Sequence, residues 1–179
     1  MKAYRVEYVQ LAGWKAGKVG LWLAENEEWV LLREIPVDYV VDGYVLLAKE
    51  HILSRKPKRG RKQVEQVLQL KGIKAELPPK FTFLETVEML RWVEQQYGLV
   101  EFTDQEDCAF FGWVNEADAV HFWIDSLTPK GTVDLCTTKD KPYVLSEIQT
   151  ISFGADYFNS LKLIWQHKQR RKLLKPSDN

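Results

Sequence analysis

The chain has 179 residues, and its 25 acidic and 25 basic side chains cancel, so the overall charge points neither toward nor away from nucleic acid. Its two cysteines, Cys108 and Cys136, do not form a CxxC motif, which argues against a disulfide-stapled scaffold and against a structural zinc site. Charged residues interrupt every apolar run, and the start of the chain lacks the apolar core of a signal peptide. We therefore expect a cytoplasmic protein that does not enter a membrane.

The first third of the chain is predicted to be β-structure. Apolar residues lie in short runs at 19–23, 29–33 and 44–48, and polar turns separate these runs. Asp42-Gly43 is the clearest turn, because glycine accepts the positive φ that a tight hairpin needs. Several short strands with closely spaced turns are typical of a sandwich or a barrel.

The middle third is predicted to be a basic linker followed by helices. Residues 54–62, with the sequence SRKPKRGRK, contain no large apolar side chain and are interpreted as an exposed linker. Residues 63–71 carry apolar side chains at helical spacing. Thr82 and Glu85 fit a capping box that opens a second helix, which is predicted to end at Gly98.

The last third returns to predicted strands and ends in a helix. The expected strands lie at 110–114, 120–124, 132–137, 143–145 and 148–153. Beyond Gly154, apolar residues at helical spacing predict a helix that runs into the basic stretch HKQRRKLLK. Cations at the end of a helix are favourable, because the carbonyl end of the helix dipole is negative.

The two β regions share one order of features. Gly17 and Gly112 each precede a strand, an acidic turn and an aromatic-aliphatic strand. A glycine turn and further β-structure follow, and Ile52 and Ile148 then occupy matching places. This order resembles the small five-stranded barrels of the Sm-like and Src-homology-type class, whose strongly bent sheets need glycines. The second copy, GWVNEADAVHFWID followed by SEIQTISFG, resembles that class better than the first.

The resemblance implies an α+β chain with two small, strongly bent antiparallel β-barrel-like modules and a C-terminal helix. The modules would span residues 1–53 and 100–179, and the basic linker and helices of residues 54–99 would join them. Tandem modules of this kind resemble those of bacterial proteins of unassigned function. The resemblance implies a fold more than RNA binding, because the Asn-Gly type of turn that typical Sm proteins use to bind RNA is absent from the corresponding hairpins.

Sequence motifs for catalysis or for cofactors are missing. The three histidines, His51, His121 and His167, have no second His or Cys at a metal-ligand spacing. The acidic stretches 25–28 and 103–107 do not follow the spacing of a calcium loop and are interpreted as solvated turns. Phosphate-binding glycine loops and nucleophile elbows are absent as well. We expect no catalytic residue, no metal and no cofactor.

Two basic clusters are the main functional lead. Local clustering of cations creates fields that attract phosphates even when the net charge is zero. The alternative is a solubilising linker and a charged helix end, because stacking aromatics are not interleaved with these cations. The predicted nucleic-acid contacts are Arg55, Lys56, Lys58, Arg59, Arg61 and Lys62 in the first cluster, and Arg170, Arg171 and Lys172 in the second.

The sequence thus predicts a non-enzymatic binding or regulatory protein. RNA or DNA is the expected partner if the two basic clusters converge on one face. The alternative is a protein-interaction or homo-oligomerising module that uses exposed strand edges. A third alternative is an enzyme whose site is assembled only in the folded chain.

Overall fold

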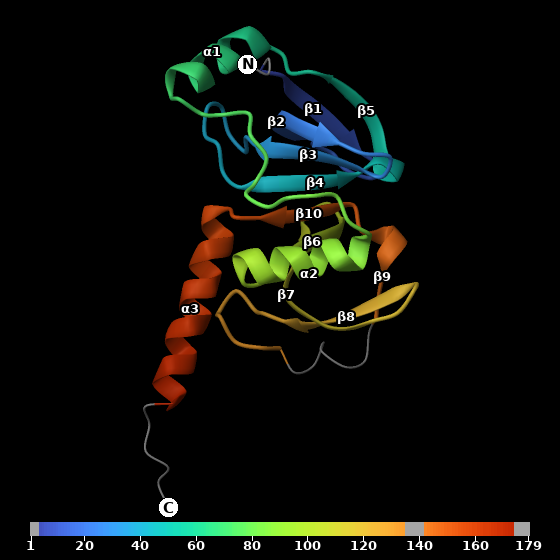
Figure 1. Cartoon of the computed structure of the whole chain (residues 1–179), viewed down its shortest axis with the longest axis vertical. Coiled ribbons are helices and arrows are strands. Elements are labelled where there is room, and N and C mark those ends of the chain that lie inside the picture. The colour runs from blue at the N-terminus through green and yellow to red at the C-terminus, as the bar shows by residue number, and fades with distance from the viewer. Residues whose placement is uncertain (1–3, 135–141, 174–179) are drawn as a thin grey trace, which may run out of the picture.

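The computed structural model describes residues 4–134 and 142–173, with only the backbone at residues 172 and 173. Figure 1 shows a twisted sheet with three helices packed around it. The strands are β1 (Val6–Leu11), β2 (Lys18–Glu25), β3 (Trp29–Glu34), β4 (Tyr44–Ala48), β5 (Ile52–Pro57), β6 (Val100–Gln105), β7 (Cys108–Ala117), β8 (His121–Ser126), β9 (Tyr143–Val144) and β10 (Thr150–Phe153). The helices are α1 (Arg61–Leu70), α2 (Thr86–Tyr97) and α3 (Asp156–Leu173).

One open antiparallel sheet replaces the two separate barrels that the sequence predicted. Its strand order is β5-β1-β2-β3-β4-β10-β6-β7-β8-β9, so the expectation of two barrel modules linked by a helical segment is wrong. The two halves join where β4 pairs with β10, from Tyr44 opposite Phe153 to Leu47 opposite Thr150. A strand at the edge of a sheet leaves its N–H and C=O groups unpaired, and this joint satisfies two such edges at once.

The two halves nevertheless repeat one strand order. β5-β1-β2-β3-β4 in the first half corresponds to β10-β6-β7-β8-β9 in the second. The matching glycines are Gly20 and Gly112, not Gly17 and Gly112, because each lies two residues before a bulge in the second strand of its half. A side chain at either position would collide with the neighbouring strand. The predicted repeat is therefore present, but its halves share one sheet.

Two local predictions changed in the middle of the chain. The basic segment 54–62 is not a free linker, because residues 52–57 form β5 and pair with β1. Pairing with β5 satisfies the second edge of β1, which would otherwise be open. The helix α2 ends at Gly98 as predicted, with a positive φ of 95° at that residue. It begins after Glu85 rather than at Thr82, and no side chain in the described part of the chain caps it.

The expected strand at 132–137 is reduced to an isolated bridge between Leu127 and Val133, and residues 135–137 lie outside the described residues. The helix expected after Gly154 is confirmed as α3. The division of the chain at residues 53 and 99 remains a prediction.

The apolar core lies on both faces of the sheet. On one face, a single cluster runs across both halves and is covered by α1, by the segment 73–84 and by α2. On the other face there are two smaller clusters, one in each half. The helix α3 covers the cluster of the second half with Phe158 and Leu161. The two helices α2 and α3 therefore pack on opposite faces of the second half.

A buried polar strip crosses the joint on the second face. Thr103 and Thr150 are paired across β6 and β10, and their hydroxyl oxygens lie 2.8 Å apart. Glu101 lies opposite Ser152 in the same ladder. Burial and the carboxylates of Glu34 and Asp42 together raise the pKa of the Glu101 carboxyl from 4.5 to about 7, while Lys18 opposes them. The carboxyl at the joint therefore keeps its proton at mildly acidic pH and loses it around pH 7.

Glu101 is expected to make the stability of the protein depend on pH. The folded chain retains a proton that the unfolded chain releases between pH 4.5 and about 7. The free energy of unfolding should therefore fall as the pH rises through that window. Glu101→Gln should abolish this part of the fall and stabilise the protein by about 1–3 kcal/mol at about pH 8, as measured by urea unfolding.

The matched control is Glu116→Gln, which changes an exposed carboxylate on β7. It should keep the pH profile of the unmodified protein. If the free energy of unfolding of Glu101→Gln still falls with pH as steeply as that of the unmodified protein, the Glu101 carboxyl titrates in the same range whether the chain is folded or unfolded.

Candidate binding groove

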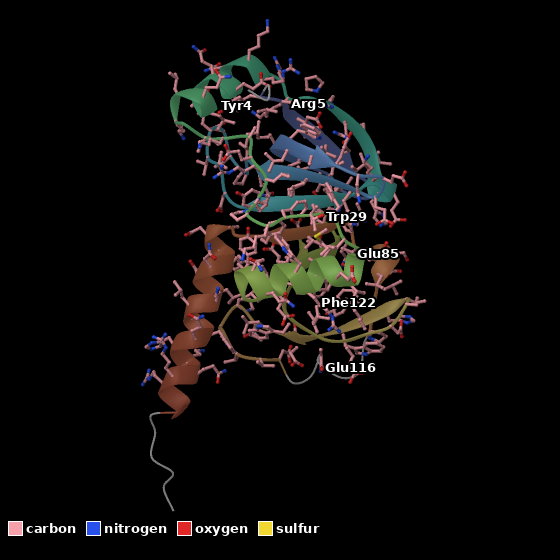
Figure 2. All side chains as sticks on the ribbon, viewed as in Figure 1. Tyr4, Arg5, Trp29, Glu85, Glu116 and Phe122 are labelled. Atoms are coloured by element: carbon pink, nitrogen blue, oxygen red, sulfur yellow. The ribbon has the colours of Figure 1, made fainter. Side chains whose placement is uncertain are left out.

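A groove opens at the joint between the two halves, beside the start of α2. Its volume is about 710 Å³, a size typical of ligand sites. It is lined by the turn between β2 and β3, the first two residues of the 3-10 turn Lys49–His51, the first turn of α2, the turn between β7 and β8, and the first two residues of the 3-10 turn Leu145–Glu147. Figure 2 shows Trp29 and Glu85 close together at its wall.

The groove brings together two copies of one local structure. Asn26 in the first half accepts hydrogen bonds at Oδ1 from the N–H groups two and three residues ahead, and Asp118 does the same in the second half. These side chains fix two tight turns, because Asn and Asp readily bond to the backbone just ahead of them. The N–H of Lys49 then bonds to the carbonyl of Glu28, as that of Leu145 bonds to the carbonyl of Val120.

The rim of the groove is acidic. The carboxylates lining it belong to Glu27, Glu28, Glu50, Glu85 and Asp118, and Lys49 is the lone Lys or Arg among the lining residues. An adjoining hollow of about 490 Å³ shares three of these residues and adds Glu88. The pKa of Asp118 is lowered by the N–H groups of Val120 and His121, so its carboxylate stays charged. The groove therefore attracts cations.

The rim is not arranged as a metal site. Within residues 4–134 and 142–173, no three His, Cys, Asp or Glu side chains are placed to hold one ion. The carboxylates instead come from several segments around a wide opening. Such an arrangement suits several separate cationic groups better than a single metal ion, which needs its ligands at close range.

The inner wall of the groove offers hydrogen-bond donors. Among the described residues, no side chain caps α2, so the N–H groups of Thr86 and Val87 in its first turn have no cap to accept them. Trp29 also lines the groove, but it is only 3% exposed, and its indole N–H, which has no partner among these residues, is itself shielded from solvent. A buried N–H without an acceptor costs free energy. The groove would therefore bind best a molecule that accepts hydrogen bonds inside and carries positive charge at the rim.

The structure does not bring the two predicted basic clusters together. Figure 1 shows β5 and α1, which carry residues 55–62, at one end of the molecule, and the last turns of α3 at the other. Arg170 and Arg171 are exposed there, and the side chain of Lys172 lies outside the described residues. The condition under which the sequence predicted a shared nucleic-acid surface is therefore not met.

Part of the first basic cluster is engaged within the fold. The Arg55 guanidinium pairs with Glu7 at 2.9 Å and also with Glu25. Arg61 pairs with Glu65 at 3.4 Å. The remaining members lie at the surface: Lys56, Arg59 and Lys62 are exposed, and Lys58 is half-buried.

The histidines and Cys108 lie apart from one another. His51 donates from Nε2 to the carbonyl oxygen of Ser146 at 2.9 Å, next to the groove. His121 lies 3.6 Å from the carboxylate of Asp118, and His167 is exposed on α3. Cys108 is half-buried at the start of β7, and Cys136 lies outside the described residues.

Both edges of the sheet oppose the addition of another strand. The outer strand β5 carries Lys56 and ends at Pro57. The other outer strand, β9, has only two residues and directly follows Pro142. Edge lysines, prolines and very short edge strands hinder strand pairing between molecules. Protein interaction is therefore better supported at the groove than at the edges.

The groove could not be recognised in the sequence, although its parts could. The acidic turns at 25–28 and near Asp118 were visible, but each is ordinary as a single turn. Comparisons with known protein families, with curated proteins and with solved structures found no match. Kinship with the Sm-like class therefore remains a prediction. None of the helices described here is both long enough and apolar enough to cross a bilayer.

Arg55 is expected to stabilise the fold rather than to bind a partner. Glu7 is only 4% exposed, so removing the guanidinium would leave its carboxylate buried with Arg5 as the remaining ion-pair partner. Arg55→Ala should lower the free energy of unfolding by about 1–3 kcal/mol, less than a fully buried pair because Arg55 is partly exposed. The control Lys62→Ala, which removes an exposed cation at the start of α1, should change stability by less than about 0.5 kcal/mol. If urea unfolding shows an equally small change in the free energy of unfolding for both variants, then the ion pairs of Arg55 do not stabilise the fold.

Proposed function

We propose that this protein is a non-enzymatic binding protein whose groove at the joint holds a basic segment of a protein partner. The observation that carries the proposal is the pairing of an acidic rim with the uncapped backbone N–H groups of the first turn of α2 in the groove wall. A polypeptide rich in Lys or Arg supplies both complements, because its side chains are cationic and its backbone carbonyls accept hydrogen bonds.

The apolar parts of the groove fit the same kind of partner. Val87, Ala119 and Val120 lie among the lining residues, and Val120 is 53% exposed. The methylene stems of Lys and Arg pack well over apolar surface while their charged ends remain at the rim. Because exposed ion pairs are individually weak, binding should depend on several of them together and should weaken with salt.

Catalysis is less well supported by the contacts at this site. Ser146 and His51 line or adjoin the groove, but the imidazole of His51 bonds to the backbone carbonyl of Ser146 and not to its hydroxyl. A nucleophile must instead be bonded to its base through the reacting atom. The absence of an enzymatic activity and the cytoplasmic location both remain predictions.

RNA or DNA binding is the second candidate function. It is favoured by the exposed cations Lys56, Arg59 and Lys62, which lie near one another around the end of β5 and the start of α1. It is weakened by the distance of this surface from the basic end of α3. A single cluster of a few lysines and arginines would give binding that is independent of sequence and sensitive to salt.

A labelled Lys/Arg-rich peptide unrelated to this chain should bind the protein, as measured by fluorescence anisotropy. The triple variant Glu27→Gln/Glu28→Gln/Glu85→Gln should weaken binding by about tenfold or more, because it removes three rim charges.

The control Glu147→Gln changes an exposed carboxylate close to the groove but outside its lining. It should bind the peptide as the unmodified protein does. Equal affinity in the triple variant would remove the groove as the binding site. If a labelled oligonucleotide binds instead, and Lys56→Ala/Arg59→Ala/Lys62→Ala abolishes that binding, the second candidate takes its place.

A further inference from the structure

The helix α3 carries an exposed stripe that the rest of the fold leaves uncovered. Its first half packs on the sheet through Phe158 and Leu161, and Trp165 contacts Trp113. Figure 1 shows the later turns of α3 projecting beyond the sheet. The stripe consists of Leu163, His167, Arg170 and Arg171, which are all exposed.

The stripe combines positive charge with one large apolar side chain. Its members recur at intervals of three and four residues, which places them along one side of a helix. Leu163 is 65% exposed, although a leucine of this kind is usually buried. Asp156 is the sole acidic residue of α3 and lies at its first position, so the exposed end of the helix is uniformly basic.

The groove and the stripe are complementary in charge and in polarity. The groove presents its ring of carboxylates together with the exposed Val120, and the stripe presents arginines together with the exposed Leu163. The two surfaces cannot meet within one chain, because α3 packs on the face of the sheet opposite to the face on which α2 and Trp29 lie. Their meeting therefore needs two molecules.

We infer that the partner of the groove is the basic stripe of α3 from a second copy of this chain. The inference rests on the proposed function of the groove and names its occupant. Arg170 and Arg171 of one copy pair with the rim carboxylates of the other, and Leu163 covers the apolar part of the groove. The two contacting surfaces differ. The copies therefore form either a closed dimer, in which each helix occupies the groove of the other copy, or an open chain, in which each copy binds the next.

The test is a charge exchange between two variants, followed by light scattering on a sizing column. The groove variant is Glu27→Lys/Glu28→Lys/Glu85→Lys, and the helix variant is Arg170→Glu/Arg171→Glu. All five positions are exposed, so both variants should keep the fold, which circular dichroism and thermal unfolding would verify. The unmodified protein should self-associate at low salt, and each variant alone should be monomeric.

An equal mixture of the two variants should associate again. In that mixture the intact helix of the groove variant meets the intact groove of the helix variant, and the lysines of the altered groove face the glutamates of the altered helix, so each contact again joins opposite charges. The control Glu147→Lys should behave as the unmodified protein does. A monomeric unmodified protein, a helix variant that still self-associates, or a mixture that stays monomeric would each overturn the inference.

Peptide binding separates this inference from the function on which it rests. A synthetic peptide with the sequence of residues 160–173, SLKLIWQHKQRRKL, should bind the groove more tightly than an unrelated basic peptide of equal charge. If the unrelated peptide binds and the copies do not associate, the groove keeps its proposed function and loses this partner. If neither peptide binds, the proposed function fails together with the inference.

Discussion

The pairing of β4 with β10 is the interaction on which the rest of this structure depends. It joins two five-stranded halves through four opposed residue pairs and places Ile151 between Leu46 and Phe102 in the shared core. It also places the turns around Asn26 and Asp118 on either side of the start of α2. Without this pairing there would be two smaller sheets with exposed edges, and the groove would have no second wall.

The sequence was most informative where structure is local. The positive φ of Gly43, the end of α2 at Gly98 and the helix after Gly154 follow from residue types that fix the backbone over a few positions. Asp42-Gly43 does not form the expected tight hairpin, because β3 ends at Glu34 and residues 35–43 connect it to β4. The repeated order of features was also visible, although its matching glycine is Gly20. The joint was not predictable, because β10 pairs with a strand that lies far from it in the sequence. The residues Thr150–Phe153 would also suit a strand that closes a barrel.

The same limit applies to the site. Each rim carboxylate is an ordinary turn or helix-start residue in the sequence. Only the pairing of β4 with β10 brings these residues around one opening. The basic clusters were easy to see, but their separation and the engagement of Arg55 by Glu7 depend on the fold. A balanced composition conceals local clustering of charge, because five carboxylates gather around the groove at the joint while the two basic clusters lie on β5 with α1 and on the last turns of α3.

The repeated strand order also sets the sequence of events during synthesis. The strand β4 is complete well before β10 leaves the ribosome, since β10 follows the whole second set of strands. Until then the N–H and C=O groups of Tyr44, Leu46 and Ala48, which face β10, have no partner, and the adjoining core is open to solvent. Unpaired apolar edges are where nascent chains aggregate. The strand that joins the two halves is thus the last strand to be made. A chain truncated before Thr150 would therefore keep the edge of β4 unpaired.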